Sequence, residues 1–215
     1  MKYKAVIFDL DGTLVNSIED IADAMNQVLK NRNYPVFDYN TYKTFVGSGV
    51  KSLIHKALPK ENQEPTEIET CLEEMMKVYS ENCTNKTATY KGILELLDIL
   101  YSKHLKLSIL SNKEDSLTKK VAAAKLPNYL VPVLGLKHEA LKKPNPQVVL
   151  EICKFHSIKP EEAIYVGDTG IDIQTAKNAN MLAVGVSWGF RDTQELIEQG
   201  ADCILNTPLD LLKVL

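Results

Sequence analysis

Short apolar runs alternate with longer amphipathic segments along most of the chain. The apolar runs are AVIF at 5–8, LSIL at 107–110, VPVL at 131–134, AIYVG at 163–167, LAVGV at 182–186 and CIL at 203–205. Segments such as GILELLDIL and PQVVLEICKFH lie between them, with apolar residues at helical spacing. Continuous apolar strands that alternate with helices are typical of a parallel sheet covered on both faces. The pattern therefore predicts an α/β fold with a doubly wound parallel sheet.

One region departs from this alternation. No strand is predicted between residues 16 and 86, where apolar residues recur at helical spacing after Ser17 and again after Thr66. A helical block of this size, inserted after the first strand, is expected to lie as a cap over the carboxyl edge of the sheet. The expected division is a core of residues 1–15 and 87–215 and an all-helical cap domain of residues 16–86.

The first predicted strand leads into two aspartates, in the stretch VIFDLDGTLV. A buried strand avoids carboxylates, because an unpaired buried charge costs several kcal/mol or shifts its pKa. Side chains alternate across a strand, so Asp9 and Asp11 are expected to project to the same side, roughly 6.5 Å apart along the chain. Ligands of open α/β sheets bind beyond the carboxyl ends of the strands. The pair is predicted to share one ion there; the alternative is two turn aspartates before a glycine.

Three further segments bring matching chemistry to the same edge. Ser111 and Asn112 follow LSIL, Asp168 and Asp172 follow AIYV, and Lys143 lies in LKKPNP, which precedes that strand in the sequence. Carboxylates, a lysine and a hydroxyl at one edge suit a hard cation together with a phosphoryl group. Each segment alone also has a plain structural interpretation: Ser111-Asn112 as a helix start, Lys143 as a solvated charge, and Asp172 as an acid in the first turn of a helix.

In order, the segments DLDGTLVNS, LSN, KKPNP and GDTGID resemble the four motifs of the haloacid dehalogenase superfamily, in its phosphatase branch. The resemblance covers essentially the whole chain, because the helical insertion stands where that family has an α-helical cap. It implies a Rossmann-like core, a hydrolase activity on phosphate esters and Mg²⁺ as the cofactor.

The resemblance also implies a role for each aspartate of the core motifs. Asp9 would be the nucleophile that forms an aspartyl-phosphate, so that one difficult displacement becomes two easier ones. Asp11 would protonate the leaving oxygen and then deprotonate the hydrolytic water. Mg²⁺ would be held by Asp9, the backbone carbonyl of Asp11, and Asp168.

The other matched positions are implied to bind the substrate or to support these groups. Ser111 and Lys143 would bind the phosphoryl oxygens, with Lys143 also offsetting the charge of the nucleophile. Thr13 and Asn112 are expected to contribute to substrate binding. Asp172 is expected behind them, where it would orient Lys143 or a metal-bound water.

Several details favour a phosphatase among the reactions of this superfamily. Dehalogenases and the phosphonate-cleaving branch lack the second aspartate, which is present here as Asp11, and the ion-pump branch has DKTG in place of DLDG. Sugar-phosphate mutases with this type of cap carry a histidine shortly after the DxDG motif, where this sequence reads NSIEDIADAMN. Two other classes remain as alternatives: a phosphoaspartate switch, which would need no cap of this size, and a binding module without turnover.

The expected substrate-binding loop of the cap is FVGSGVKSLI. Gly47, Ser48 and Gly49 could present backbone N–H groups to a substrate carboxylate or second phosphate, helped by Lys51; the alternative is an ordinary turn between helices. This loop and the stretch VSWGFRDTQELIEQGADCIL resemble phosphoglycolate phosphatases. The expected substrate is therefore a small phosphate monoester such as 2-phosphoglycolate, with pyrophosphate or another small metabolite as the alternative. Trp188 either lines the cleft or packs beside it.

Composition and charge exclude other kinds of partner. Lys and Arg number 25 against 28 Asp and Glu, and the resulting net charge of -3 gives no sign of nucleic-acid or membrane binding. No segment approaches the roughly 18 apolar residues of a membrane span. The four cysteines form no CxxC pair, which indicates free thiols. The expectation is a cytoplasmic enzyme acting on a small phosphorylated metabolite, as a monomer or a homodimer.

Overall fold

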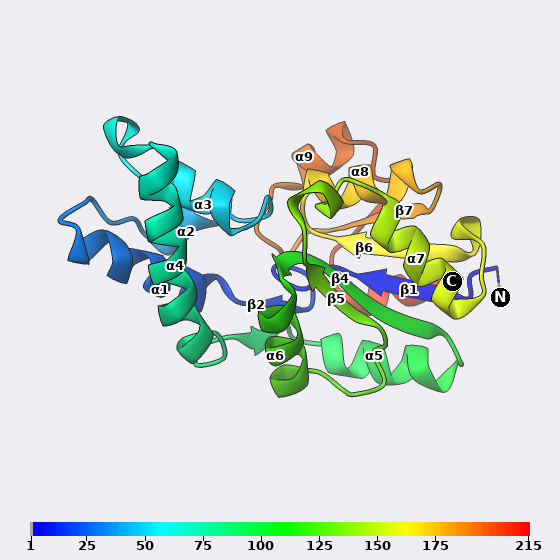
Figure 1. Ribbon diagram of the computed structural model, residues 1–215. Coiled ribbons are helices and arrows are strands. Elements are labelled where there is room, and N and C mark those ends of the chain that lie inside the picture. Colours follow the sequence, from blue (N-terminus) through cyan, green and yellow to red (C-terminus); the bar gives the residue numbers. More distant parts are fainter. Residues whose placement is uncertain (1) are drawn as a thin grey trace.

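A six-stranded parallel sheet with helices on both faces forms the larger part of the molecule in the computed structural model, which describes residues 2–215 (Figure 1). The strand order is β5-β4-β1-β6-β7-β8, and every neighbouring pair is parallel. The strands are β1 (Ala5–Phe8), β4 (Lys106–Glu114), β5 (Val133–Leu136), β6 (Ala163–Gly167), β7 (Leu182–Val186) and β8 (Cys203–Leu205). The predicted doubly wound α/β fold is confirmed.

Helices cover both faces of this sheet, so strands such as β1, β6 and β7 are apolar throughout rather than alternating with polar residues. Alternate side chains of β1 enter two separate apolar clusters. Val6 and Phe8 join residues of α5 and α6, whereas Ala5 and Ile7 join residues of α7 and α8. The covering helices are α5 (Ile93–Ser102), α6 (Asp115–Lys125), α7 (Gln147–His156), α8 (Gly170–Asn178) and α9 (Thr193–Glu198).

Four helices stand apart from the sheet, at the left of Figure 1, and are called the cap below. They are α1 (Ile18–Asn31), α2 (Tyr39–Phe45), α3 (Val50–Ala57) and α4 (Pro65–Asn82), with the 3-10 turn η1 (Lys60–Asn62) before α4. The chain enters the cap after β2 (Val15–Asn16) and leaves it before β3 (Ala88–Thr89), and these two strands pair antiparallel. Both connections of the chain between the cap and the sheet thus lie on the same side of the molecule.

The observed strands depart from the predicted ones at three places. The β2–β3 pair was not predicted, because strands of two residues carry no periodic signal. β4 runs on to Glu114, so Ser111 and Asn112 lie within the strand rather than after it. β5 begins only at Val133, since Pro132 has no N–H to donate to a neighbouring strand.

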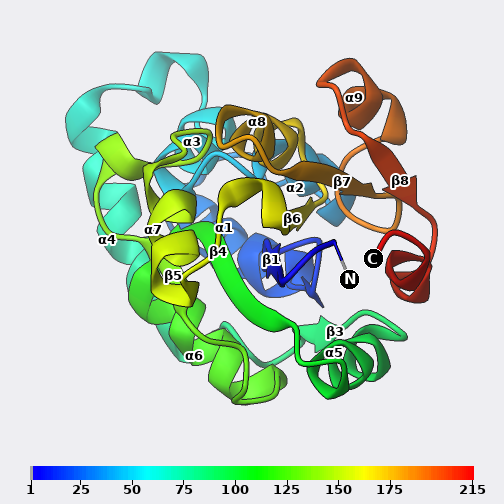
Figure 2. The ribbon, with the colours of Figure 1, turned by 90° about the vertical axis from the view of Figure 1, so that its right-hand side faces the viewer.

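The carboxyl ends of the strands point toward the cap, and both termini lie at the opposite end of the sheet (Figures 1 and 2). The remaining short helices are η2 (Glu139–Leu141), η3 (Pro160–Glu162) and η4 (Pro208–Lys213). No helix among residues 2–215 is both long enough and apolar enough to cross a bilayer. The sequence motifs of the core are therefore brought to the sheet edge that faces the cap.

Candidate active site

A cavity lies between this carboxyl edge of the sheet and the cap. It offers about 70 Å³ of water-accessible space. Core residues that line it include Asp9, Asp11, Ser111, Asn112, Lys113, Lys143, Thr169 and Phe190. Cap residues that line it are Ile21, Val46, Gly47, Gly49, Val50, Leu53, Met75, Met76 and Tyr79. The floor is therefore charged and polar, while the roof is mainly apolar.

Asp9 follows directly after β1 and is held at the floor of this cavity. Its N–H donates to the carbonyl of Val166 at 2.9 Å, which continues the pairing of β1 with β6. The ammonium of Lys143 lies 2.8 Å from Oδ1 of Asp9 and 2.7 Å from Oδ1 of Asp172. Burial raises the pKa of Asp9 to about 7, and Lys143 offsets part of this effect. Burial alone would lower the pKa of Lys143, but Asp172 and Asp9 raise it well above its ordinary value.

Lys143 is fixed by both its backbone and its side chain. Its N–H donates to Oδ1 of Asn112 at 2.9 Å, and the Asn112 amide donates back to the Lys143 carbonyl at 3.3 Å. The ammonium also lies 3.1 Å from the Tyr165 hydroxyl and 3.2 Å from the carbonyl of Leu110. These contacts hold an otherwise flexible side chain in one direction, toward the nucleophile.

Asp11 is held by two groups that lie far apart in the sequence. The ammonium of Lys113 lies 2.8 and 2.7 Å from its two carboxylate oxygens, and the Ser17 hydroxyl donates to Oδ1 at 2.5 Å. Lys113 is buried and lies over the ring of Tyr79 in the cap, 4.9 Å from its centre. Although burial opposes it, the carboxylate of Asp11 raises the pKa of Lys113. Lys113 therefore carries a charge inside the site.

Asp168 is completely buried and is enclosed by glycines. Its Oδ1 accepts from the Thr13 hydroxyl at 3.2 Å, and its Oδ2 accepts from the N–H of Phe190 at 2.8 Å. A Cβ atom on Gly12 or on Gly189 would come within 2.2 Å of this side chain, so neither position has room for another residue. Burial raises the pKa of Asp168 well above its ordinary value, and the neighbouring carboxylates add to the effect.

Negative charge exceeds positive charge among the buried groups of the site. Four carboxylates meet two ammonium groups, which leaves two negative charges over: Asp9, Asp11, Asp168 and Asp172 against Lys113 and Lys143. Oxygen atoms of Asp9, Asp168 and Asp172 lie within 4.8 Å of one another. Hard oxygen donors with a surplus of two charges suit a divalent cation such as Mg²⁺. Burial and the neighbouring carboxylates raise the pKa values of Asp9 and Asp168, and a bound cation would lower them again.

The carboxylate of Asp172 binds both Lys143 and the first residues of its own helix, α8. While Oδ1 accepts from Lys143, Oδ2 accepts from the hydroxyl and the N–H of Thr169 at 2.7 and 3.1 Å. This is a capping box, in which the acid at the third helical position binds back to the residue before the helix. The same side chain thus begins α8 and orients the lysine.

The structure brings only part of the predicted substrate-binding set to the cavity. Ser111, Asn112, Gly47 and Gly49 line it, whereas Ser48 is not among the lining residues of the described chain. The amide of Asn112 donates to the carbonyls of Gly47 and Lys143, so it joins the cap loop to the core.

Three other predicted positions face away from the cavity. The ammonium of Lys51 pairs with Glu69 of α4 at 3.0 Å on the exposed side of the cap. The hydroxyl of Thr13 is directed at Asp168, as described above, and the Trp188 indole donates to the Thr13 carbonyl at 3.0 Å. Trp188 therefore packs beside the site instead of lining it.

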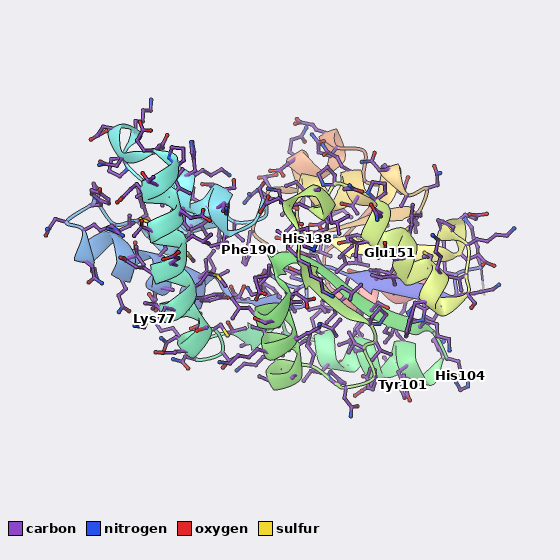
Figure 3. The ribbon with its side chains drawn as sticks, in the orientation of Figure 1. Lys77, Tyr101, His104, His138, Glu151 and Phe190 are labelled. Carbon is purple, nitrogen blue, oxygen red and sulfur yellow. The ribbon has the colours of Figure 1, made fainter. Side chains whose placement is uncertain are left out.

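Two residues of the site were missed by the sequence analysis. Lys113 directly follows the Ser111-Asn112 pair, and this adjacency was the only available signal. Tyr79 lies at the end of a cap helix whose spacing indicates only an apolar face. Figure 3 places Phe190, another lining residue, where the cap and the core meet.

Comparisons with known proteins match both the sheet and the cap. A family model described as haloacid dehalogenase-like hydrolase matches residues 6–186. Phosphoglycolate phosphatase of Aquifex aeolicus is 33% identical over 213 residues, which cover 99% of this chain and 96% of that protein. Phosphoglycolate phosphatase of Chromobacterium violaceum is 32% identical over 212 residues, which cover 97% of this chain and 94% of that protein.

A solved structure has the same architecture throughout. The crystal structure of a predicted phosphoglycolate phosphatase from Haemophilus somnus superimposes with a TM-score of 0.91 at 27% identity. The superposition covers 100% of this chain and 98% of that one, so it includes the cap as well as the sheet.

Proposed function

The chain belongs to the haloacid dehalogenase-like hydrolase family and is a phosphatase, and we propose that it hydrolyses a small phosphate monoester through a covalent intermediate on Asp9. The observation that carries this proposal is the buried floor of the cavity. There a carboxylate lies 2.8 Å from a buried lysine, and the surplus of negative charge matches one divalent cation. A site built only for binding an anion would not bury four carboxylates.

Mg²⁺ fits this set of donors, and Asp9, the backbone carbonyl of Asp11, and Asp168 would hold it. When bound, it would supply positive charge that reduces the repulsion between the nucleophile and the phosphate. Lys143 supplies a fixed charge for the same purpose. The hydroxyl of Ser111 accepts from the N–H of Lys113 at 3.2 Å, so its own hydrogen remains for a phosphoryl oxygen.

In the first step a carboxylate oxygen of Asp9 attacks phosphorus. A new P–O bond to Asp9 forms as the ester P–O bond breaks, and Asp11 gives the leaving oxygen the proton that it took from water in the preceding turnover. In the second step water attacks the same phosphorus, and Asp11 takes the proton that this water loses. The P–O bond to Asp9 then breaks, which restores the carboxylate and releases inorganic phosphate. Lys113 and Ser17 hold Asp11 in place for both proton transfers.

The cap limits the substrate in size and excludes water. Its apolar residues, Val46, Val50, Leu53 and Met75 among them, close the cavity from above. Bulk water around the aspartyl-phosphate would compete with ordered hydrolysis, so closure protects the intermediate. The names of the relatives favour 2-phosphoglycolate as the substrate.

Phosphate release from 2-phosphoglycolate, pyrophosphate and an aryl phosphate tests this proposal. Activity should require Mg²⁺ and disappear with a chelator, and 2-phosphoglycolate should have the highest kcat/KM. Asp9→Asn should be inactive, whereas Asp98→Asn, which changes an exposed aspartate on α5, should leave activity intact. Full activity of the metal-free protein, or of Asp9→Asn, would refute the mechanism. A preference for pyrophosphate would refute the choice of substrate alone.

A further inference from the structure

Arg191 reaches from the core to the cap. It lies in the loop after β7, and its guanidinium donates to the carbonyls of Lys43, Thr44 and Val46, the last two at 3.3 and 2.6 Å. Lys43 and Thr44 lie in the last turn of α2, where helix carbonyls lack partners within the helix, and Val46 is the residue that follows the helix. On its other side, Nε of Arg191 lies 3.3 Å from the carboxylate of Glu195. The side chain of Arg191 thus extends from the core and donates hydrogen bonds to the carbonyls at the C-terminal end of a cap helix.

Arg191 is anchored to the same elements of the core that carry the buried carboxylates of the cavity floor. Phe190, the residue before Arg191, donates its N–H to Asp168. Glu195, the partner of Arg191, accepts from the N–H of Gly170 at 2.9 Å, at the start of α8. The guanidinium therefore has a defined position relative to the floor of the cavity.

The contact also determines where the cap loop lies. Val46, whose carbonyl Arg191 binds, is followed by Gly47 and Gly49, and all three line the cavity. The Gly47 carbonyl accepts from the amide of Asn112 at 3.1 Å, which is a second contact between the loop and the core. The chain joins cap and sheet only through the β2–β3 side. Arg191 supplies a non-covalent attachment for the cap loop.

We propose that Arg191 is a positioning residue that holds the cap loop closed over the active site. This inference rests on the proposed function of the site, because closure matters for a substrate bound beneath the loop. A guanidinium is suited to the task because its five N–H groups, arranged in one plane, can serve several carbonyls and a carboxylate together. A lysine at this position would keep the charge but not this set of contacts.

The test compares Arg191→Ala and Arg191→Lys with Lys56→Gln. Lys56 of α3 donates to the same Thr44 carbonyl at 3.2 Å, but it belongs to the cap itself, so its loss leaves cap and core joined. Hydrogen exchange is measured over residues 43–50, and kinetics with 2-phosphoglycolate and an aryl phosphate. Both Arg191 variants should exchange faster in this segment, and kcat/KM should fall on the order of tenfold or more, mainly through KM. Lys56→Gln should match the wild-type protein in both measurements.

Exchange over residues 43–50 that stays at the wild-type rate in a folded Arg191 variant would overturn the inference. The same holds if kcat falls while KM and exchange are unchanged, because the loop would then be closed without Arg191. If Arg191→Ala does not fold, Arg191→Lys decides the question. The exchange comparison does not depend on turnover, so a wild-type protein without phosphatase activity would refute the proposed function and leave this test valid.

Discussion

Replacing Lys143 with methionine should destabilise the protein strongly as well as inactivate it. The side chain of Lys143 is only 4% exposed, and its ammonium lies 2.8 and 2.7 Å from the carboxylates of Asp9 and Asp172. Methionine fills a similar volume but leaves both acids without their cation. Removing one partner of a buried ion pair costs about 3–5 kcal/mol, because the other charge remains buried and unpaired.

Although two acids lose their cation in Lys143→Met, the loss in free energy of unfolding should stay at about 3–5 kcal/mol instead of doubling. Asp9, with a pKa of about 7, can take up a proton when its partner is lost. Most of the penalty then falls on Asp172, whose side chain is 1% exposed. A second change, Asp172→Asn, should therefore restore a large part of the stability in the Lys143→Met background without restoring activity, because the substrate still lacks its lysine.

Urea denaturation in the presence of a chelator measures these free energies of unfolding without interference from a bound cation. Lys142→Met is the matched control: this neighbouring lysine is partly exposed and pairs with Glu139 on the surface, so its loss should cost less than about 1 kcal/mol. The reasoning is refuted if Lys143→Met is as stable as Lys142→Met, or if the double variant is less stable than Lys143→Met alone.

Three further predictions follow from the site and its surroundings. Asp11→Asn should slow turnover by a factor on the order of 10²–10⁴, and less for an aryl phosphate with a good leaving group; equal losses for aryl and alkyl esters would contradict its role as the acid. Gly189→Ala places a Cβ against Asp168, so it should raise the Mg²⁺ concentration needed for half activity, which a metal titration checks. Burial lowers the pKa of His156 below its usual 6.5, so the unfolded chain binds this proton more readily. The free energy of unfolding of the wild-type protein, taken relative to that of His156→Gln, should therefore fall as the pH drops below about 6.5, as denaturation of both proteins at several pH values would show.

The sheet could be predicted from the sequence because its strands are buried on both faces. Runs such as AVIF and AIYVG are apolar without interruption, and both became central strands. The core motifs could be placed together for a related reason, since parallel strands bring their carboxyl ends to one edge. Asp9, Asp168 and Lys143 could therefore be predicted as site residues without knowing where the cap lies.

Contacts between distant segments could not be predicted in this way. Lys113 and Asp11 lie 102 positions apart, and Arg191 and Thr44 lie 147 apart, so no local pattern records either contact. Ser17 has the sequence position of a helix cap, yet its hydroxyl binds Asp11 and makes no cap hydrogen bond.

Proximity along the chain does not determine where the side chain of Lys51, in the cap loop, lies. Lys51 lies two residues after Gly49 and was expected at the substrate. Glu69 of the next helix, 3.0 Å from its ammonium, draws it to the surface of the cap instead. Where two helices pack, the partner of a charged side chain depends on the neighbouring helix and not on the nearest glycine.

The most direct test of the central claim is to locate the phosphoryl group on the protein during turnover. Asp11→Asn slows the attack of water on the intermediate, so this variant should accumulate it when mixed with an aryl phosphate and Mg²⁺. After an acid quench, peptide mass spectrometry should find one phosphoryl group on the peptide that contains Asp9. The Asp9→Asn/Asp11→Asn variant should show none. Turnover by Asp11→Asn with no phosphoryl group on that peptide, or with the group on another residue, would contradict Asp9 as the nucleophile.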